Sequence, residues 1–302
     1  MTDSSDSAPL VSSGLPSPAF TTTTRTDLVT AASDVVIRPD QLDEHTDGSY
    51  GRIDITYKIL YLKLHGMAAT ARILLAIGGV RWESIYPNNW SAEKGQVPLG
   101  VMPVLYETHH CSHDSATASS EQEQRRRQQR RRQQRQDLVL EIPESEAIER
   151  YLARKFSLLG RDAWEETAIN VFYCSSNAVM SLYVNKVLLA FPDTKSRELE
   201  KFVNKNVKDW IVQHEKWLER NGSNGFYVGN QLSLADIRSV VCLDRFMTIS
   251  ECKDMFSAAH TPGLLKLKQN LESIPRYAAW IASAEFEDIN ISTRQRLALL
   301  SG

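Results

Sequence analysis

The chain has 302 residues, of which 42% are hydrophobic and 8% aromatic, and this composition excludes collagen-like, coiled-coil and fully disordered proteins. Its length suffices for one large domain or two modest ones with their own cores. Lys and Arg number 35 against 37 Asp and Glu, so the formal net charge of -2 argues against a general nucleic-acid binder. No window of about 18 consecutive apolar residues is present, which argues against a transmembrane helix.

The near-neutral total conceals one basic, low-complexity stretch. Residues 121–136 read EQEQRRRQQRRRQQRQ and contain seven Arg and two Glu. The rest of the chain has 28 basic and 35 acidic side chains, a net charge of -7. We interpret the tract as a solvated expansion. The alternative is that residues 125–135 contact an anionic surface such as RNA, an acidic protein or lipid headgroups.

Residues 1–52 are rich in Ser, Thr, Asp and Pro and poor in large apolar groups. Such a segment cannot bury enough surface to offset its ordering entropy, so we expect a disordered tail. The start lacks the charged residues and apolar block of a secretory signal. The cysteines show no CxxC spacing, which predicts reduced thiols in a cytoplasmic protein. They are Cys111, Cys174, Cys242 and Cys252.

Residues 53–160 alternate between strand and helix patterns. MAATARILLAIGG, residues 67–79, predicts a helix that ends at a glycine pair. Residues 143–160 predict a second helix with Ser145 as its N-cap. The order is then β-α-β followed by β-β-α, interrupted by a low-complexity insert at 108–137. Four strands are predicted, at ITYKILYL (55–62), at VRWESIYP (80–87), after a turn in PLGVMPVLYE (98–107) with Pro103 at the strand's entrance, and at LVLEI (138–142).

Residues 161–302 have helical periodicity almost throughout, so the small α/β domain is followed by an all-α domain. Ser233 and Asp236 have the spacing of a capping box before an apolar helix. Ile274 and Pro275 open what we predict to be the last helix.

Six short motifs occur in a fixed order over both domains, from about residue 55 to residue 283. They are Tyr61, Gly66 and Arg72; Trp90 and Lys94; Pro98, Gly100, Met102 and Pro103; Glu144, Ser145 and Ala147; Gly229, Asn230, Ser233 and Asp236; and Ile274, Pro275 and Trp280. In this order they resemble the cytosolic glutathione S-transferases, and the second motif is similar to the sigma-like class that includes prostaglandin D synthases. The resemblance implies a thioredoxin-like N-terminal domain, an all-helical C-terminal domain and a homodimer.

The resemblance also implies a catalytic role for Tyr61. Glutathione reacts as a thiolate, and a thiol with a pKa of ~8.5 is only a few per cent ionised at neutral pH. A hydroxyl that donates to the sulfur stabilises the anion and lowers this pKa. Tyr61 would be that donor, and the alternative is an ordinary aromatic strand residue. The second substrate would be a small hydrophobic electrophile, which the enzyme conjugates or isomerises in a detoxification reaction.

The other implied site residues would hold the glutathione peptide. Pro103 would be cis, which would turn the backbone of Met102 toward the ligand. Ser145 at a helix start suits the glutamyl α-carboxylate, and Glu144 suits the α-amino group. Trp90 and Lys94 would donate to the glycyl carboxylate. The alternatives are a plain N-cap for Ser145 and a solvated side chain for Lys94. Phe172 and Tyr173 are candidates for the electrophile pocket, with core packing as the alternative.

Three departures from the family pattern weigh against efficient turnover. Met67 stands where sigma-class members usually carry an arginine, His65 replaces a basic residue, and Asn170 replaces an acidic one. The alternative function is therefore a non-catalytic binding or structural protein of the same fold, as lens crystallins of this family are. No metal is expected, because the cluster from His109 to Asp114 lacks a second pair of ligands.

Overall fold

The computed structural model describes residues 53–111 and 138–301. The expected disordered tail at 1–52 and the Arg-rich tract lie outside the described residues. None of the described helices is both long and apolar enough to cross a lipid bilayer.

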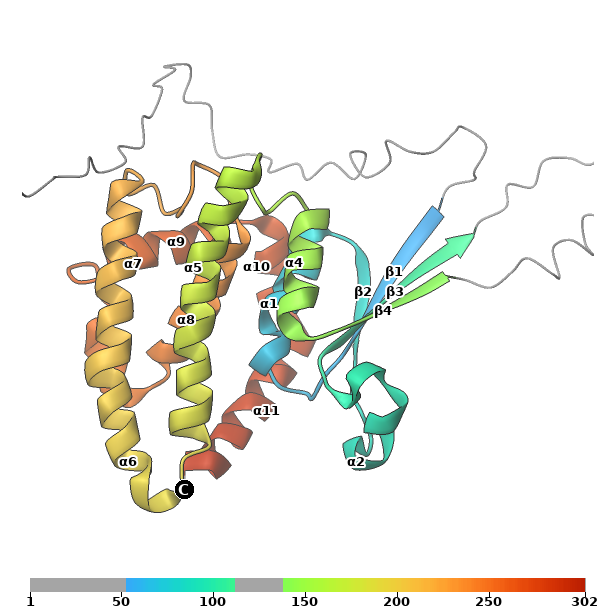
Figure 1. Ribbon diagram of the computed structural model, residues 1–302, viewed down its shortest axis with the longest axis horizontal. Coiled ribbons are helices and arrows are strands. Elements are labelled where there is room, and N and C mark those ends of the chain that lie inside the picture. Colours follow the sequence, from blue (N-terminus) through green and yellow to red (C-terminus); the bar gives the residue numbers. More distant parts are fainter. Residues whose placement is uncertain (1–52, 112–137, 302) are drawn as a thin grey trace, which may run out of the picture. The chain divides into compact units, whose positions relative to one another are not determined.

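One mixed sheet has the strand order β2-β1-β3-β4. Its strands are β1 (Ile53–Leu60), β2 (Arg81–Ile85), β3 (Val104–Cys111) and β4 (Leu138–Pro143). β1 is parallel to β2 and antiparallel to β3, and β3 is antiparallel to β4. Figure 1 shows β1, β3 and β4 projecting beyond the helices. The four predicted strands are confirmed, but β3 runs four residues past the predicted start of the insert, because 108–111 pair with β1.

Two helices cover the sheet. α1 (Ala69–Gly78) connects β1 to β2, and α4 (Ser145–Lys155) follows β4. Leu74 of α1 and Ile148 of α4 are fully buried with Ile59 and Leu105 of the sheet, which forms the core of this part. Between β2 and β3 the chain makes short helical turns. These are α2 (Trp90–Glu93), η3 (Lys94–Gln96) and η4 (Pro98–Gly100).

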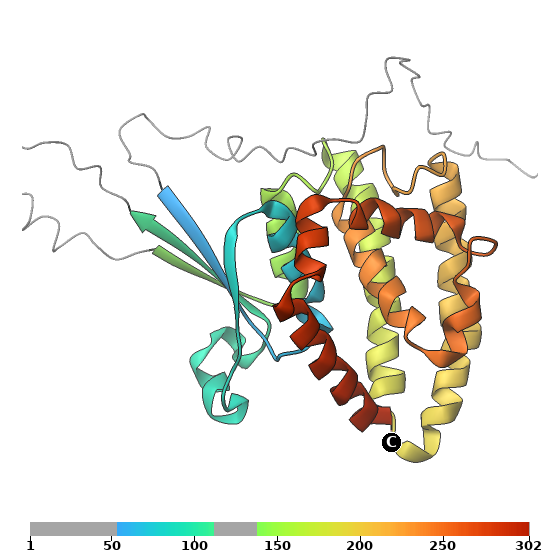
Figure 2. The ribbon, with the colours of Figure 1, turned by 180° about the vertical axis from the view of Figure 1, so that it is seen from behind.

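Most of the remaining described residues are helical, as predicted. Figures 1 and 2 show α5 and α7 as long neighbours, with α8 beside α5. α8 is almost entirely buried, and the predicted capping box of Ser233 and Asp236 is present at its start. The helical segments are α5 (Ala163–Leu182), η5 (Tyr183–Leu188), α6 (Pro192–Lys201), η6 (Phe202–Val207), α7 (Lys208–Arg220), α8 (Leu234–Met247), η7 (Ser250–Met255), α9 (Pro262–Glu272), α10 (Pro275–Ile281) and α11 (Ala284–Ser301).

Two sequence predictions about helices are wrong in detail. The helix opened by Pro275 is not the last, because α11 follows it. The apolar residues of α11 do not keep to one helical face, so periodicity gives little signal there. Ser145 is the first helical residue rather than the N-cap; the cap is Glu144, whose φ is 71° and whose side chain makes no capping hydrogen bond.

Candidate functional site

The sheet register brings three segments of the predicted site to one edge. Leu60 at the end of β1 pairs with Val104 at the start of β3, and Val104 pairs with Pro143 at the end of β4. Tyr61, Pro103 and Glu144 are the next residues beyond those positions. The three segments therefore lie side by side, although they are far apart in the sequence.

The Tyr61 hydroxyl lies against the turn that precedes α1. The backbone N–H of Met67 donates to Tyr61 Oη over 3.2 Å. Gly66 has a φ of +40°, and a Cβ at this residue would lie 2.6 Å from Tyr61 Oη. Only glycine fits this close approach without strain. Because Tyr61 Oη accepts the hydrogen bond from Met67, its own proton is free to be donated to a ligand.

Arg72 of α1 holds the segment between Tyr61 and this turn. Arg72 is 1% exposed, and its guanidinium donates to the carbonyl oxygens of Leu64 (2.6 Å) and Leu62 (3.4 Å) and to Ser84 Oγ (3.3 Å). A buried guanidinium stays charged, so it supplies positive potential beneath the loop that carries Tyr61.

His65 connects the same loop to α11. Its Nε2 lies 2.7 Å from Asn290 Oδ1, and its backbone N–H donates to Thr293 Oγ1 over 3.0 Å. The ring also packs on Phe286, with 4.9 Å between centroids. Burial lowers the pKa of His65, and the charge of Arg72 adds to this effect. From the sequence, His65 is known only as the replacement of a basic residue in the family pattern. No sequence motif indicates that its partner is α11.

At the Pro103 segment the predicted cis bond is confirmed, and at the Glu144 segment Ser145 begins the helix without being its N-cap. The Met102–Pro103 peptide bond is cis, and Pro103 is buried. Ser145 is 5% exposed at the first turn of α4, whereas Glu144 is exposed. The roles of these residues toward glutathione remain predictions from the resemblance.

Trp90 and Lys94 lie on the excursion between β2 and β3. This excursion leaves the sheet after Ile85, which pairs with Leu60, and returns at Pro103, so it begins and ends at the edge that carries Tyr61. Trp90 opens α2 after the Asn89 cap and is partly exposed, and Lys94 is exposed. Figure 1 shows the excursion extending away from the sheet.

Phe172 and Tyr173 belong to the core rather than to an open pocket. Phe172 is 7% exposed and stacks on Tyr227 at a centroid distance of 4.6 Å. Tyr173 is fully buried and donates its hydroxyl to Glu149 Oε2 over 2.7 Å. Their alternative interpretation, core packing, is therefore the one that the structure supports. At the third departure from the family pattern, Asn170 accepts from Arg150 Nε over 3.2 Å.

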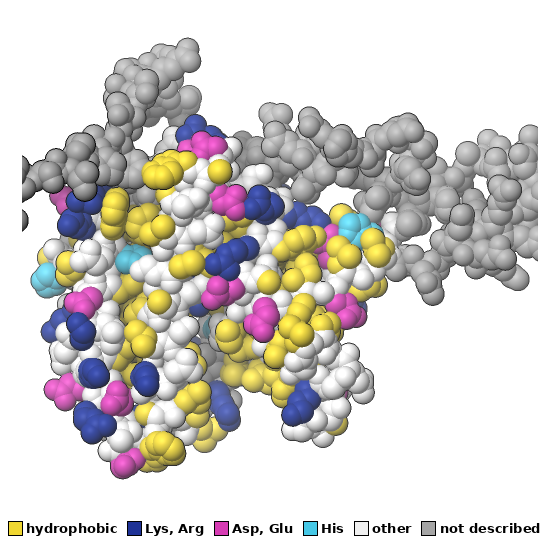
Figure 3. Space-filling view, viewed as in Figure 1, with side chains coloured by type: hydrophobic (Ala, Val, Ile, Leu, Met, Phe, Trp, Pro, Cys, Tyr) yellow, Lys and Arg dark blue, Asp and Glu magenta, His cyan; other side chains and the backbone are white. Residues whose placement is uncertain are grey.

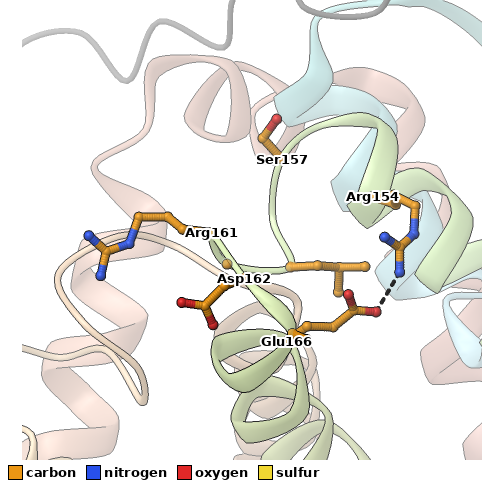
Figure 4. Close-up of a pocket in the computed structure, with 8 residues that line it drawn as sticks. Arg154, Ser157, Arg161, Asp162 and Glu166 are labelled. Atoms are coloured by element: carbon orange, nitrogen blue, oxygen red, sulfur yellow. Dashed lines mark hydrogen bonds and ion pairs between the residues drawn. The ribbon is translucent and has the colours of Figure 1, made fainter.

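A cavity of about 360 Å³ lies where α4 connects to α5, at the end of α4 opposite Ser145 (Figure 4). Arg154 and Arg161 line it, but Arg154 pairs with Glu166 and Arg161 pairs with Glu165. The cations are thus neutralised, and the cavity is separate from the Tyr61 edge. In the part of the chain that the structure describes, no group of His, Cys, Asp and Glu side chains is arranged to hold a metal ion.

Comparison with known proteins identifies relatives of this architecture. Residues 182–284 match the family model "Glutathione S-transferase, C-terminal domain". The chain is 23% identical to S-crystallin SL11 of Nototodarus sloanii, over 75% of this chain and 95% of that protein. It is 24% identical to hematopoietic prostaglandin D synthase of Gallus gallus, over 74% and 94%. It is 25% identical to glutathione S-transferase 3 of Caenorhabditis elegans, over 76% and 96%.

The fold is that of solved glutathione transferases. The structure of the Fasciola hepatica sigma class transferase covers 77% of this chain and 100% of its own, with a TM-score of 0.58 and 20% identity. The structure of prostaglandin synthase D of Nilaparvata lugens covers 75% of this chain and 97% of its own, with a TM-score of 0.56 and 22% identity. The expected order of a thioredoxin-like domain followed by a helical domain is therefore confirmed.

Proposed function

We propose that this chain, which has the fold of the glutathione S-transferases and matches the model of their C-terminal domain, binds glutathione. It joins the glutathione sulfur to a small hydrophobic electrophile. Tyr61 donates to the sulfur and stabilises the thiolate, which attacks the electrophilic carbon. The thiol proton passes to solvent. In substitution the carbon loses a leaving group with its bonding electrons, and in addition the atom that gains the electron pair takes a proton back from solvent. Isomerisation of such a compound uses the same thiolate.

One observation supports this proposal: the Met67 N–H donates a hydrogen bond to the Tyr61 hydroxyl at the sheet edge where Pro103 and Glu144 also lie. The N–H polarises the phenol and leaves its proton free for a thiolate. The buried Arg72 charge favours an anion above the same loop. The Met67 backbone thus supplies a donor at the position of the missing arginine.

The remaining contacts to glutathione follow the predicted roles. Met102 N–H and C=O pair with the peptide backbone, and the first turn of α4 at Ser145 receives the glutamyl α-carboxylate. Glu144 accepts from the α-amino group, and Trp90 and Lys94 donate to the glycyl carboxylate. Binding that positions the peptide and a ready thiolate together account for catalysis.

We also propose that the protein forms a cytoplasmic homodimer through the outer face of α5. Trp164, Val171 and Leu182 are 66%, 58% and 39% exposed at positions that follow one face of this helix. Figure 3 shows apolar side chains on the side that α5 presents. We call these three residues the apolar stripe of α5; an interface with a second copy of the chain would remove them from water.

The relationship to S-crystallins favours a second candidate, a protein that keeps the fold and the glutathione site without turnover. Measuring glutathione affinity by calorimetry and conjugation with a chlorodinitrobenzene substrate separates the two. Tyr106 is a half-buried tyrosine within β3 and serves as the control. Binding together with conjugation that falls in Tyr61→Phe but not in Tyr106→Phe supports the transferase. Binding without conjugation supports the second candidate, and absence of glutathione binding contradicts both.

A further inference from the structure

α11 contacts the Tyr61 loop at several points, and His65 lies at their centre. Nε2 of His65 contacts Asn290, its backbone N–H contacts Thr293, and its ring contacts Phe286. These α11 residues are three or four positions apart, so they lie on one face of the helix. Figure 2 shows α11 running past the start of α1.

Only one residue separates this anchor from the donor to Tyr61. His65 is followed by Gly66, whose Cα lies so near the phenol that a Cβ would stand 2.6 Å from Tyr61 Oη. Met67 comes next and donates its N–H to the same oxygen. A displacement of His65 therefore moves the donor and the closest packing neighbour of the Tyr61 hydroxyl together.

Both α1 and α11 hold the loop, and Lys63 also pairs with Asp288 of α11. Arg72 fixes the carbonyl groups of Leu62 and Leu64 from beneath. Beyond Leu64 the loop is tied by the contacts of His65 with α11. Arg72 of α1 therefore holds the loop only as far as Leu64, and α11 holds it at His65.

We propose that His65 is a positioning residue: docked on α11, it holds the Met67 N–H against the Tyr61 hydroxyl, so that α11 sets how strongly Tyr61 activates the glutathione thiol. The proposal rests on the proposed function for its glutathione readout. It assigns α11 a part in activation although no described side chain of α11 needs to touch glutathione.

The charges around this contact come from three elements. Lys63 of the loop pairs with Asp288 of α11 at 2.9 Å, and Arg72 of α1 lies close enough to affect His65. On α11, Asn290 donates to Glu287, which pairs with Arg294, and Glu285 accepts from Tyr86. In this setting the neutral imidazole donates from Nε2 to Asn290 Oδ1.

The test uses the full-length protein and the variants His65→Ala, Asn290→Ala and their double variant, with His65→Gln as the conservative replacement. Lys63→Ala is the matched control, because it removes another contact between the same loop and α11. Three quantities are measured besides kcat: the pKa of the bound glutathione thiol from thiolate absorbance, the glutathione Kd, and the ¹³C resonance of the labelled Tyr61 ring without ligand.

We expect His65→Ala and Asn290→Ala to raise the pKa of the bound thiol by about one unit and to lower kcat about tenfold near neutral pH. The glutathione Kd should change less than about threefold, because the peptide is held from other segments. The double variant should be no worse than His65→Ala alone, since both remove one interaction. His65→Gln should recover part of the loss, and Lys63→Ala should leave all three quantities unchanged.

The Tyr61 resonance separates this proposal from the proposed function. It should shift in His65→Ala and Asn290→Ala and stay in place in Lys63→Ala, whether or not glutathione binds. If the wild-type protein fails to bind glutathione while the resonance shifts, the proposed function fails and the positioning role stands. A Tyr61 resonance or a thiol pKa that is unchanged in a folded His65→Ala variant overturns the positioning role.

Discussion

The backbone N–H of Met67 donates to the hydroxyl oxygen of Tyr61 over 3.2 Å, while the Met67 side chain is 51% exposed. The Met67 side chain therefore contributes little to the position of the Tyr61 hydroxyl, and the hydrogen-bond donor comes from the main chain. Met67 replaces the arginine of the family pattern, but its backbone N–H still donates a hydrogen bond to Tyr61.

Met67→Ala should therefore keep kcat within about twofold, because the N–H that contacts Tyr61 is retained. Met67→Arg should raise turnover, because a cation beside the thiolate lowers the pKa of the thiol. Steady-state kinetics at several pH values measures both. A tenfold loss in Met67→Ala would show that the side chain itself matters.

Gly66→Ala should damage both stability and activity. A Cβ at Gly66 would meet Tyr61 Oη at 2.6 Å, and the φ of +40° disfavours any other residue. We expect a loss of about 1–3 kcal/mol in the free energy of unfolding and a displaced phenol. Gly95→Ala is the control, because a Cβ there meets nothing within 4 Å. Equal denaturation midpoints for the two variants would contradict the close approach.

The buried imidazole of His214 should make the fold sensitive to acid. Its Nδ1 lies 2.6 Å from Tyr227 Oη and its Nε2 lies 3.0 Å from Ser175 Oγ, and burial lowers its pKa to about 3. Between pH ~6.5 and 3 the unfolded chain binds a proton at this residue that the folded chain does not. The stability contributed by the neutral ring is present above pH ~6.5 and is lost as pH falls.

Urea unfolding at a series of pH values measures this effect in the wild type and in His214→Gln. The variant should be less stable at neutral pH, because two hydrogen bonds of the buried ring change. Its unfolding free energy should fall less steeply below pH ~6.5, because glutamine does not titrate. Parallel curves for the two proteins would mean that His214 does not contribute to the acid sensitivity.

Val171→Arg should dissociate the proposed dimer. The exposed valine lies in the apolar stripe of α5, and an interface cannot accept an unpaired charge there without a large cost. Val212→Arg is the matched control, because Val212 of α7 is 60% exposed and lies outside the stripe. Analytical ultracentrifugation should show a monomer for the first variant only. A dimer in both would place the interface elsewhere.

The sequence predicted much of the fold because each element carries a local signal. Strand alternation located β1 to β4, and the spacing of Ser233 and Asp236 located the start of α8. The sequence did not predict α11 as a separate last helix, because its partner is a loop more than 200 residues earlier. A single contact such as that of His65 with Asn290 leaves no periodic pattern. Glu144 was missed as the cap because its φ of 71° depends on the β4–α4 connection.

In the candidate site, too, the sequence predicted the features with a local signal and missed those that depend on tertiary contacts. The sequence identified Tyr61, Gly66, Pro103 and Ser145 as one constellation, and register explains why the segments that carry them meet at one edge. It did not indicate that the Tyr61 hydroxyl receives a backbone donor, because that contact depends on the path of the turn at Gly66 and not on residue type.

The pKa of the glutathione thiol in the bound state tests the central claim most directly. Thiolate absorbance of the saturated complex is titrated in the wild type, in Tyr61→Phe and in Tyr106→Phe. We predict that the thiol pKa of the wild-type and Tyr106→Phe complexes lies at least about one unit below the free value of ~8.5, and that Tyr61→Phe returns it toward that value. The same thiol pKa in the wild type and in Tyr61→Phe would contradict the assignment of Tyr61 as the group that activates glutathione.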